Sequence, residues 1–212
     1  MAYHVTEIID GCSRRHVLDR DRKKERLKEP HLMTARGIVV HRFVENYLKS
    51  GRKSIAYDEV RDEMSNEMFD AVMREEIDIS PESVEEYGRG TVEKRFVITL
   101  DDGTEVLMTP DLYTEDTLVD WKTSLKKSKK HVMQVSVYVR LLERIDGKKR
   151  DAVVVYLRTE KKEKVAWDET EEYYEQWLQK LHKFDEEVKR GGVPNVGFRC
   201  VYCPYRHICS GV

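Results

Sequence analysis

Residues 109–124, with the sequence TPDLYTEDTLVDWKTS, decide the fold of this chain. The stretch places Pro110-Asp111 one short turn before Asp120 and Lys122. β-rich segments flank the turn at residues 114–116, so we expect Asp111 and Asp120 to lie on neighbouring strands. Their side chains would then meet at one end of a sheet. Asp-x-Lys and Glu-x-Lys spacings recur elsewhere in the chain, so only the setting of this pair indicates a site.

Helical and strand patterns alternate on both sides of this stretch. A tight turn is expected at Asp101-Asp102-Gly103, and apolar periodicity distinguishes the helices from the strands. The predicted elements are helices at 34–49, 129–145 and 170–190 and strands at 91–100, 104–113, 117–122, 152–157 and 164–168. The charged segment 52–90 is expected to form a helical insertion, broken near Ser80-Pro81. Together they predict one α/β domain over residues 1–212, with a mixed central sheet flanked by helices.

The composition is that of a globular protein, with 37% charged and 40% hydrophobic residues. We expect a cytoplasmic protein with no membrane partner, because no apolar run is long enough to span a bilayer and the N-terminus does not resemble a signal peptide. The net charge is −2, yet residues 14–28 and 122–130 are locally basic. Such segments can bind a phosphate backbone, or they can form a solvated helix face and a loop.

Two neighbouring carboxylates would repel each other unless a cation lay between them. Oxygen ligands suit Mg²⁺ or Mn²⁺, which can polarise a phosphate and activate water. Lys122 follows Asp120 by two residues, so both side chains are expected on the same face of a strand. There Lys122 could orient or deprotonate water, or stabilise developing charge. The alternative is a surface hairpin with an ordinary ion pair.

Two helical pairs accompany this candidate site. Gln134 and Tyr138 share one helix face directly after it and could contact DNA or position the lysine. Gly37 and His41 have the same spacing on an earlier helix, where the glycine would allow another backbone to approach. Each pair alone is also consistent with a structural role. Glu93 could lie near this site, but it is interpreted as an ion-pair residue of the predicted hairpin.

The combined set is Gly37-x-x-x-His41, Pro110-Asp111, Asp120-Trp121-Lys122 and Gln134-x-x-x-Tyr138. It resembles the RecB-type nuclease motifs of the PD-(D/E)xK superfamily, which implies a restriction-endonuclease-like core. The resemblance implies that His41, Asp111, Asp120 and the backbone carbonyl of Trp121 bind Mg²⁺ or Mn²⁺. Lys122 would be the catalytic lysine, and Gln134 and Tyr138 would complete the catalytic set. Many members carry a glycine where this chain has Met108.

The four cysteines are Cys12, Cys200, Cys203 and Cys209. Metal binding is a better interpretation than disulfides for a cytosolic protein, and the thiolates suit either zinc or an iron–sulfur cluster. One N-terminal cysteine with a C-terminal C-x2-C-x5-C resembles RecB-like nucleases whose ends are joined by a 4Fe–4S cluster, or in some members 2Fe–2S. Residues 1–30 and 191–212 would form this iron–sulfur subdomain.

The chain most resembles the CRISPR-associated RecB-like exonucleases. That resemblance implies a single-stranded DNA exonuclease with 5′→3′ polarity, which trims DNA ends for spacer acquisition beside the adaptation integrase and could form a homo-oligomer. The predicted DNA contacts are Lys126, Lys127, Lys129, Lys130 and Tyr138. Two alternatives remain open: a RecB-like repair or viral nuclease with no CRISPR role, and a non-catalytic, zinc-stapled DNA-binding protein.

Overall fold

The computed structural model describes residues 2–27, 32–63 and 90–209, together with residues 65, 69, 84, 86 and 87. A five-stranded sheet has the order β2-β5-β6-β7-β8, and a three-stranded sheet has the order β1-β4-β3. The strands are β1 (Tyr3–His4), β2 (Thr91–Val92), β3 (Phe96–Thr99), β4 (Glu105–Met108), β5 (Leu112–Tyr113), β6 (Thr117–Lys122), β7 (Asp151–Tyr156) and β8 (Lys161–Val165). β6 and β7 run parallel while the other pairs of the larger sheet are antiparallel, so the predicted mixed sheet is confirmed.

The predicted hairpin is divided between the two sheets. β3 and β4 pair with each other, whereas β2 and β5 pair in the larger sheet. Pro110 lies between β4 and β5 and has no backbone N–H to donate to a ladder. On the other chain segment, Glu93 has a φ of 48°, which interrupts the extended backbone after β2. The two long strands predicted at 91–100 and 104–113 were therefore each wrong in extent.

The helices are α1 (Val5–Asp10), α2 (Ser13–Asp21), α3 (Leu32–Ser50), α4 (Lys53–Glu63), α7 (Lys129–Asp146) and α8 (Thr170–Lys189). Short 3-10 turns occupy Lys23–Glu25, Trp167–Glu169 and Phe198–Tyr202. The last predicted strand, 164–168, is displaced, since β8 begins earlier and a 3-10 turn follows it. α4 begins the predicted insertion, whereas its expected break near Ser80-Pro81 lies outside the described residues.

α7 begins and ends at defined capping residues. The hydroxyl of Ser128 accepts a hydrogen bond from the backbone N–H of Lys130, which satisfies one free donor of the first turn. At the other end Gly147 has a φ of 72°, a left-handed conformation that glycine adopts without steric cost. The predicted helix at 129–145 is thus confirmed. Its N-terminal half lies against the end of β6.

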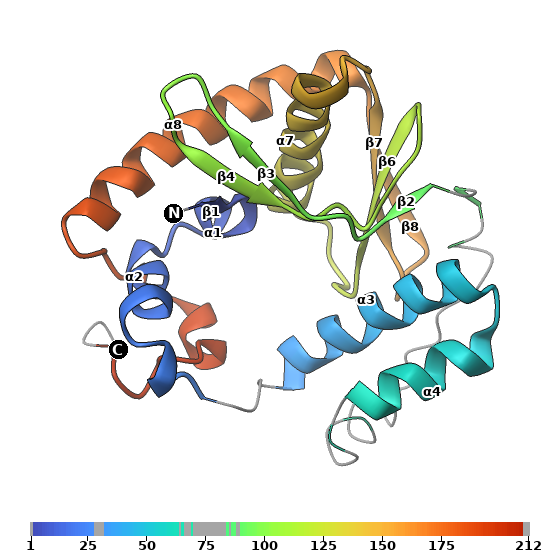
Figure 1. The fold of residues 1–212 in the computed structure, drawn as a ribbon, viewed down its shortest axis with the longest axis horizontal. Coiled ribbons are helices and arrows are strands. Elements are labelled where there is room, and N and C mark those ends of the chain that lie inside the picture. Colours follow the sequence, from blue (N-terminus) through green and yellow to red (C-terminus); the bar gives the residue numbers. More distant parts are fainter. Residues whose placement is uncertain are drawn as a thin grey trace.

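The larger sheet is covered by helices on both faces. Alternate residues of β6 and β7, such as Leu118 and Val154, belong to the core shared with α1, α7 and α8. The intervening residues, such as Val119 and Trp121, pack in a second core with α3 and α4. Figure 1 shows the sheet between α7 and the α3–α4 pair. Both β6 and β7 are therefore buried on two sides, which explains their continuous apolar runs.

Segments from the two ends of the chain lie side by side, as blue and red ribbons in Figure 1. Ser13 Oγ donates a hydrogen bond of 2.6 Å to Glu187, and the Arg14 backbone N–H donates one of 3.1 Å to the Val193 carbonyl. Tyr205 is fully buried against α2. Contacts between residues far apart in sequence therefore hold the N-terminal helices against α8 and the C-terminal segment.

Some charges of the basic run at residues 14–28 are paired within the run. Arg20 pairs with Asp21, and Arg22 pairs with Glu25. The run as a whole stays basic, with eight Lys and Arg residues against three Asp and Glu. None of the helices in the described ranges is long and apolar enough to cross a membrane.

Candidate active site

The end of β6 positions Asp120 and Lys122 on the face that α7 covers. Asp120 is 1% exposed, and Lys122 Nζ lies 2.6 Å from its Oδ2 atom. That oxygen takes no aligned hydrogen bond from any described residue, although the ammonium group is close. The predicted pairing of the two residues on one strand face is confirmed.

Gln134 on α7 connects this pair to Tyr138. Its Nε2 atom donates hydrogen bonds to Asp120 Oδ1 over 3.0 Å and to the Tyr138 hydroxyl over 3.3 Å. Its Oε1 atom accepts a hydrogen bond of 3.0 Å from Lys122. The Gln134 amide therefore contacts both charged residues of β6, Asp120 and Lys122, which agrees with the positioning role expected of it. Tyr138 is 4% exposed, so the direct DNA contact expected of its side chain is not supported.

The Asp111 carboxylate contacts both β6 and α3. Its Oδ2 atom accepts a hydrogen bond of 2.8 Å from the backbone N–H of Trp121, and its Oδ1 atom lies 3.1 Å from His41 Nδ1. The structure thus brings together the predicted histidine and the first aspartate. Gly37 does not play its expected part, because a Cβ atom placed there would meet no atom within 4 Å. Met108 is buried in the core, where a glycine would leave a cavity.

Glu93 is the residue whose role the sequence pattern missed. It lies outside the β3–β4 hairpin, and its Oε1 atom is 3.9 Å from His41 Nδ1. The interpretation as a hairpin ion pair is therefore wrong. Its backbone N–H donates to the Asp111 carbonyl over 3.1 Å, which places the two residues opposite each other. The register of the predicted hairpin, counted from the turn at residues 101–103, could have indicated this neighbour, because β2 and β5 keep the register of β3 and β4.

Three carboxyl groups of the site lie near one histidine and one lysine, so these groups affect one another's pKa values. Burial raises the pKa of Asp120 to about 6, with Lys122 opposing the rise. Burial, aided by Asp111, raises the pKa of Glu93 to about 7. Burial opposes the charged form of Lys122, but Asp120 and Asp111 outweigh it and raise the lysine's pKa. Burial likewise opposes protonation of His41, and Asp111 again raises its pKa overall. The lysine therefore holds its proton, while the carboxyl groups compete for too few cations.

These donors fit a divalent metal ion. Ligand atoms of His41, Glu93 and Asp111 all lie within 4.8 Å of one another. Within the described residues, no other group of three such ligands is as close. Asp120 is outside this group, and its buried Oδ2 atom lies 2.6 Å from the Lys122 ammonium. Imidazole and carboxylate oxygens are ligands that suit Mn²⁺ and Mg²⁺.

The four cysteines line one cavity of about 410 Å³ between the terminal segments. They are not among the three-ligand groups within 4.8 Å, whereas sulfur atoms around one tetrahedral zinc ion would be separated by about 3.8 Å. Within the described residues the four thiols therefore share a cavity without forming a close group of ligands. Burial raises the pKa of Cys203.

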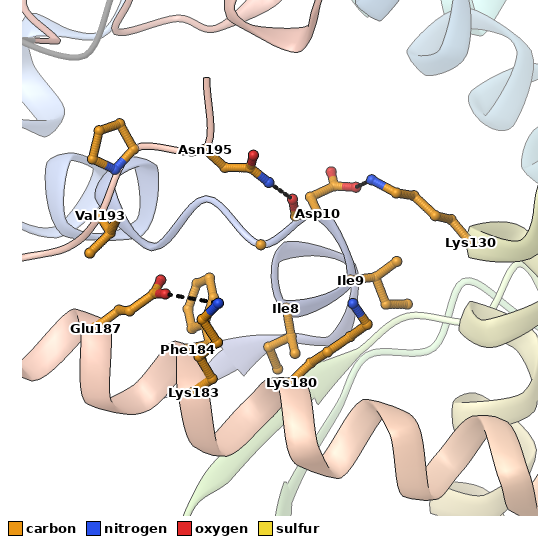
Figure 2. A pocket seen from close by; sticks show the side chains of 12 residues that line it. Ile8, Ile9, Asp10, Lys130, Lys180, Lys183, Phe184, Glu187, Val193 and Asn195 are labelled. Atoms are coloured by element: carbon orange, nitrogen blue, oxygen red, sulfur yellow. Dashed lines mark hydrogen bonds and ion pairs between the residues drawn. The ribbon is translucent and has the colours of Figure 1, made fainter. Parts of the chain in front are cut away.

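A second cavity, of about 380 Å³, adjoins the first between α1, α8 and the segment after α8. Figure 2 shows Lys130 reaching toward Asp10 at its edge, with Asn195 bound to the carbonyl of Asp10. Lys130 Nζ and Asp10 Oδ1 are 3.8 Å apart. The other predicted DNA-contacting lysines, Lys126, Lys127 and Lys129, are exposed on the segment that leads from β6 to α7.

Residues 111–210 match the family model described as the PD-(D/E)XK nuclease superfamily. The matched residues are slightly less than half of the chain and include Asp111, Asp120, Lys122 and Gln134, so this part of the chain is similar to nucleases of that superfamily. No curated protein matches the sequence.

Two solved structures share the fold over nearly all of this chain. The first is a "Putative exonuclease" from Eubacterium rectale, with 16% identity and a TM-score of 0.63, covering 98% of this chain and 88% of that chain. The second is named SSO0001, with 13% identity and a TM-score of 0.50, covering 99% of this chain and 86% of that chain. Together with the family match, they confirm the predicted α/β core of the PD-(D/E)XK type.

Proposed function

We propose that this protein is a divalent-metal-dependent exonuclease that degrades single-stranded DNA from an end. The observation that carries the proposal is the hydrogen-bonded set of Asp120, Lys122 and Gln134 beside the His41–Asp111 pair. A non-catalytic DNA-binding protein has no need to bury a lysine and an aspartate together, because desolvating both is costly.

Each side chain has a separable task in this proposal. Asp111, Asp120 and His41 bind Mg²⁺ or Mn²⁺, with the carbonyl of Trp121 as a further ligand. When bound, the ion polarises the scissile phosphate and lowers the pKa of water. Lys122, held protonated by two carboxylates, stabilises negative charge on the phosphate. Gln134 keeps the lysine and Asp120 in a fixed orientation, and Tyr138 supports Gln134 from within the core.

The choice of a DNA end as substrate rests on two further points. Exposed lysines follow the catalytic strand directly, where they would attract a phosphate backbone. The name of the Eubacterium rectale structure agrees with an exonuclease. The 5′→3′ polarity and the single-stranded preference come from the resemblance to the CRISPR-associated exonucleases.

We further propose that the cysteines Cys12, Cys200, Cys203 and Cys209 bind a 4Fe–4S cluster, with 2Fe–2S as the smaller alternative. Their shared cavity joins segments from both ends of the chain. The choice of a cluster over zinc comes from the resemblance of the C-x2-C-x5-C spacing to the RecB-like nucleases whose ends are joined by such a cluster. A cluster here would be structural, because it would close a very long loop between residues that the unfolded chain separates.

The cellular role that we propose is processing of DNA ends for CRISPR spacer acquisition, with the adaptation integrase as partner. This rests on the resemblance of the cysteine and nuclease motifs together. A RecB-like repair or viral nuclease would have the same site. The neighbouring genes discriminate between these roles, since only the first requires integrase genes nearby.

The decisive experiment measures cleavage of single-stranded DNA labelled at either the 5′ or the 3′ end, with Mg²⁺, Mn²⁺ or chelator. We expect the wild type to release short products in a metal-dependent manner, and Asp120→Ala and Lys122→Ala to be inactive. Circular single-stranded DNA should resist an exonuclease. Asp168→Ala, on an exposed turn, controls for loss of an aspartate elsewhere. Equal cleavage by the wild type and both site variants would refute the nuclease assignment.

A further inference from the structure

Glu93 is placed beside Asp111 by the backbone rather than by chance contact of two side chains. β2 pairs with β5 through Val92 and Leu112, and the Glu93 N–H continues this ladder to the carbonyl of Asp111. Residues directly opposite in an antiparallel pair project their side chains to the same face. Two carboxylates are thus presented together, an arrangement that is unfavourable without a compensating positive charge.

The backbone around Glu93 is under unusual constraint. A φ of 48° lies in the left-handed region, which is sterically unfavourable for a residue with a side chain. Just before β2, Gly90 packs so closely that an added Cβ atom would lie 2.4 Å from the carbonyl oxygen of Tyr113. The close approach of Gly90 to Tyr113 fixes the N-terminal end of β2. The left-handed conformation of Glu93 turns the chain toward the site at the C-terminal end of β2. Such local strain is characteristic of positions that deliver a functional group.

We infer that Glu93 is a direct ligand of the divalent metal ion, together with His41 and Asp111. Their ligand atoms lie within 4.8 Å of one another, and His41 Nδ1 is 3.1 Å from Asp111 and 3.9 Å from Glu93. The imidazole lies close to both carboxylates. This inference rests on the proposed function, because it assigns a further ligand to the same metal-dependent nuclease.

The position of Glu93 separates metal binding from phosphate chemistry. Lys122 and Gln134 form hydrogen bonds on the β6 and α7 side of the site. Glu93 approaches from β2, next to α3, where His41 lies. A third carboxylate raises the negative charge available to a hard cation such as Mn²⁺ or Mg²⁺. Loss of Glu93 should therefore weaken metal binding more than it slows cleavage at saturating metal.

The test is Mn²⁺ binding by calorimetry and by electron paramagnetic resonance, without DNA, on full-length protein purified with its cysteine site intact. We expect Glu93→Gln to raise the Kd for Mn²⁺ by about 10-fold to 100-fold. The Mn²⁺ concentration for half-maximal cleavage should rise by the same factor. Glu93→Asp keeps the carboxylate and should recover part of the affinity. Glu115→Gln, on an exposed turn, is the matched control.

The outcomes distinguish this inference from the function on which it rests. If the wild type binds Mn²⁺ and cleaves DNA while Glu93→Gln binds Mn²⁺ equally well, Glu93 is not a ligand and the nuclease remains. A folded Glu93→Gln that keeps its Mn²⁺ affinity but loses cleavage would also overturn the inference. A wild type that neither binds Mn²⁺ nor cleaves DNA removes the proposed function itself. Circular dichroism of each variant verifies that it is folded.

Discussion

Lys122 Nζ and Gln134 Oε1 are joined by a hydrogen bond of 3.0 Å that crosses from the central sheet to α7. The nitrogen of the same amide donates a hydrogen bond to Asp120, so Gln134 contacts both charged residues of β6. The amide cannot rotate by half a turn without facing the lysine with a donor and the aspartate with an acceptor. Gln134 therefore has one productive orientation, and it enforces the geometry of the pair.

Gln134→Leu should lower kcat by about 10-fold to 100-fold, the usual effect of losing a residue that orients a metal-site group. The KM for DNA should change little, because Gln134 is 9% exposed and faces the interior. Steady-state cleavage at saturating Mn²⁺ measures both parameters. Gln176→Leu on the exposed face of α8 provides the control. A rise in KM with kcat unchanged would show that Gln134 contacts substrate instead.

Glu93 predicts how the metal-free protein responds to pH. Its pKa is about 7 in the fold and near 4.5 without the fold, so between these values the folded state binds more protons. Stability then decreases as pH rises through this window. The surrounding groups are Asp111, His41, Arg42 and Glu45, of which only the two carboxylates reinforce the shift.

The matching measurement is the Tm of wild type and Glu93→Gln in chelator from pH 5 to pH 8. Gln cannot ionise, so the variant's advantage in Tm should grow from pH 5 to about pH 7 and level off above it. The pKa of Asp120 is also raised, so its ionisation likewise lowers stability as pH rises. This contribution is common to both proteins and cancels when they are compared. Parallel Tm curves over this range would mean that Glu93 ionises normally in the fold.

Cys200→Ala should release most of the bound iron and lower the Tm, since metal binding joins the two ends of the chain and is coupled to folding. Iron, zinc and sulfide per chain, together with visible absorption, identify the group that wild type contains. Val201→Ala, at the exposed neighbouring position, controls for disturbance of this turn. A colourless wild type with one zinc per chain would contradict the cluster assignment.

Local pattern was sufficient for the elements that carry the catalytic pair. Helical periodicity predicted α7 with Gln134 and Tyr138 on one face, and the apolar run 152–157 predicted a buried strand, which the structure places beside β6. These features depend on residues close in sequence, where spacing maps directly onto a helix or strand face. Asp120 and Lys122 follow from the same logic, since alternate residues of one strand share a face.

Features that depend on distant pairing were not predictable in the same way. The two-residue strand β1 pairs in parallel with β4, and nothing in its own sequence specifies that partner. The break at Pro110 moves β5 into a different sheet from β4, although the β2–β5 register continues that of β3 and β4 and so keeps Glu93 opposite Asp111. A turn signal indicates where strands reverse, but the sheet that each strand joins is decided by packing.

The contact between the chain ends predicts unequal effects of two adjacent glycine substitutions. Gly191 and Gly192 both have left-handed backbones, with φ of 93° and 81°, so alanine is unfavourable at each by roughly 1–2 kcal/mol. A Cβ atom at Gly192 would lie 2.7 Å from the Cα atom of Arg14, whereas one at Gly191 would meet nothing within 4 Å. Gly192→Ala should therefore lower the free energy of unfolding by about 1–3 kcal/mol more than Gly191→Ala. Urea unfolding of the two variants measures this difference directly. Equal destabilisation would mean that α2 shifts away from the C-terminal segment without cost.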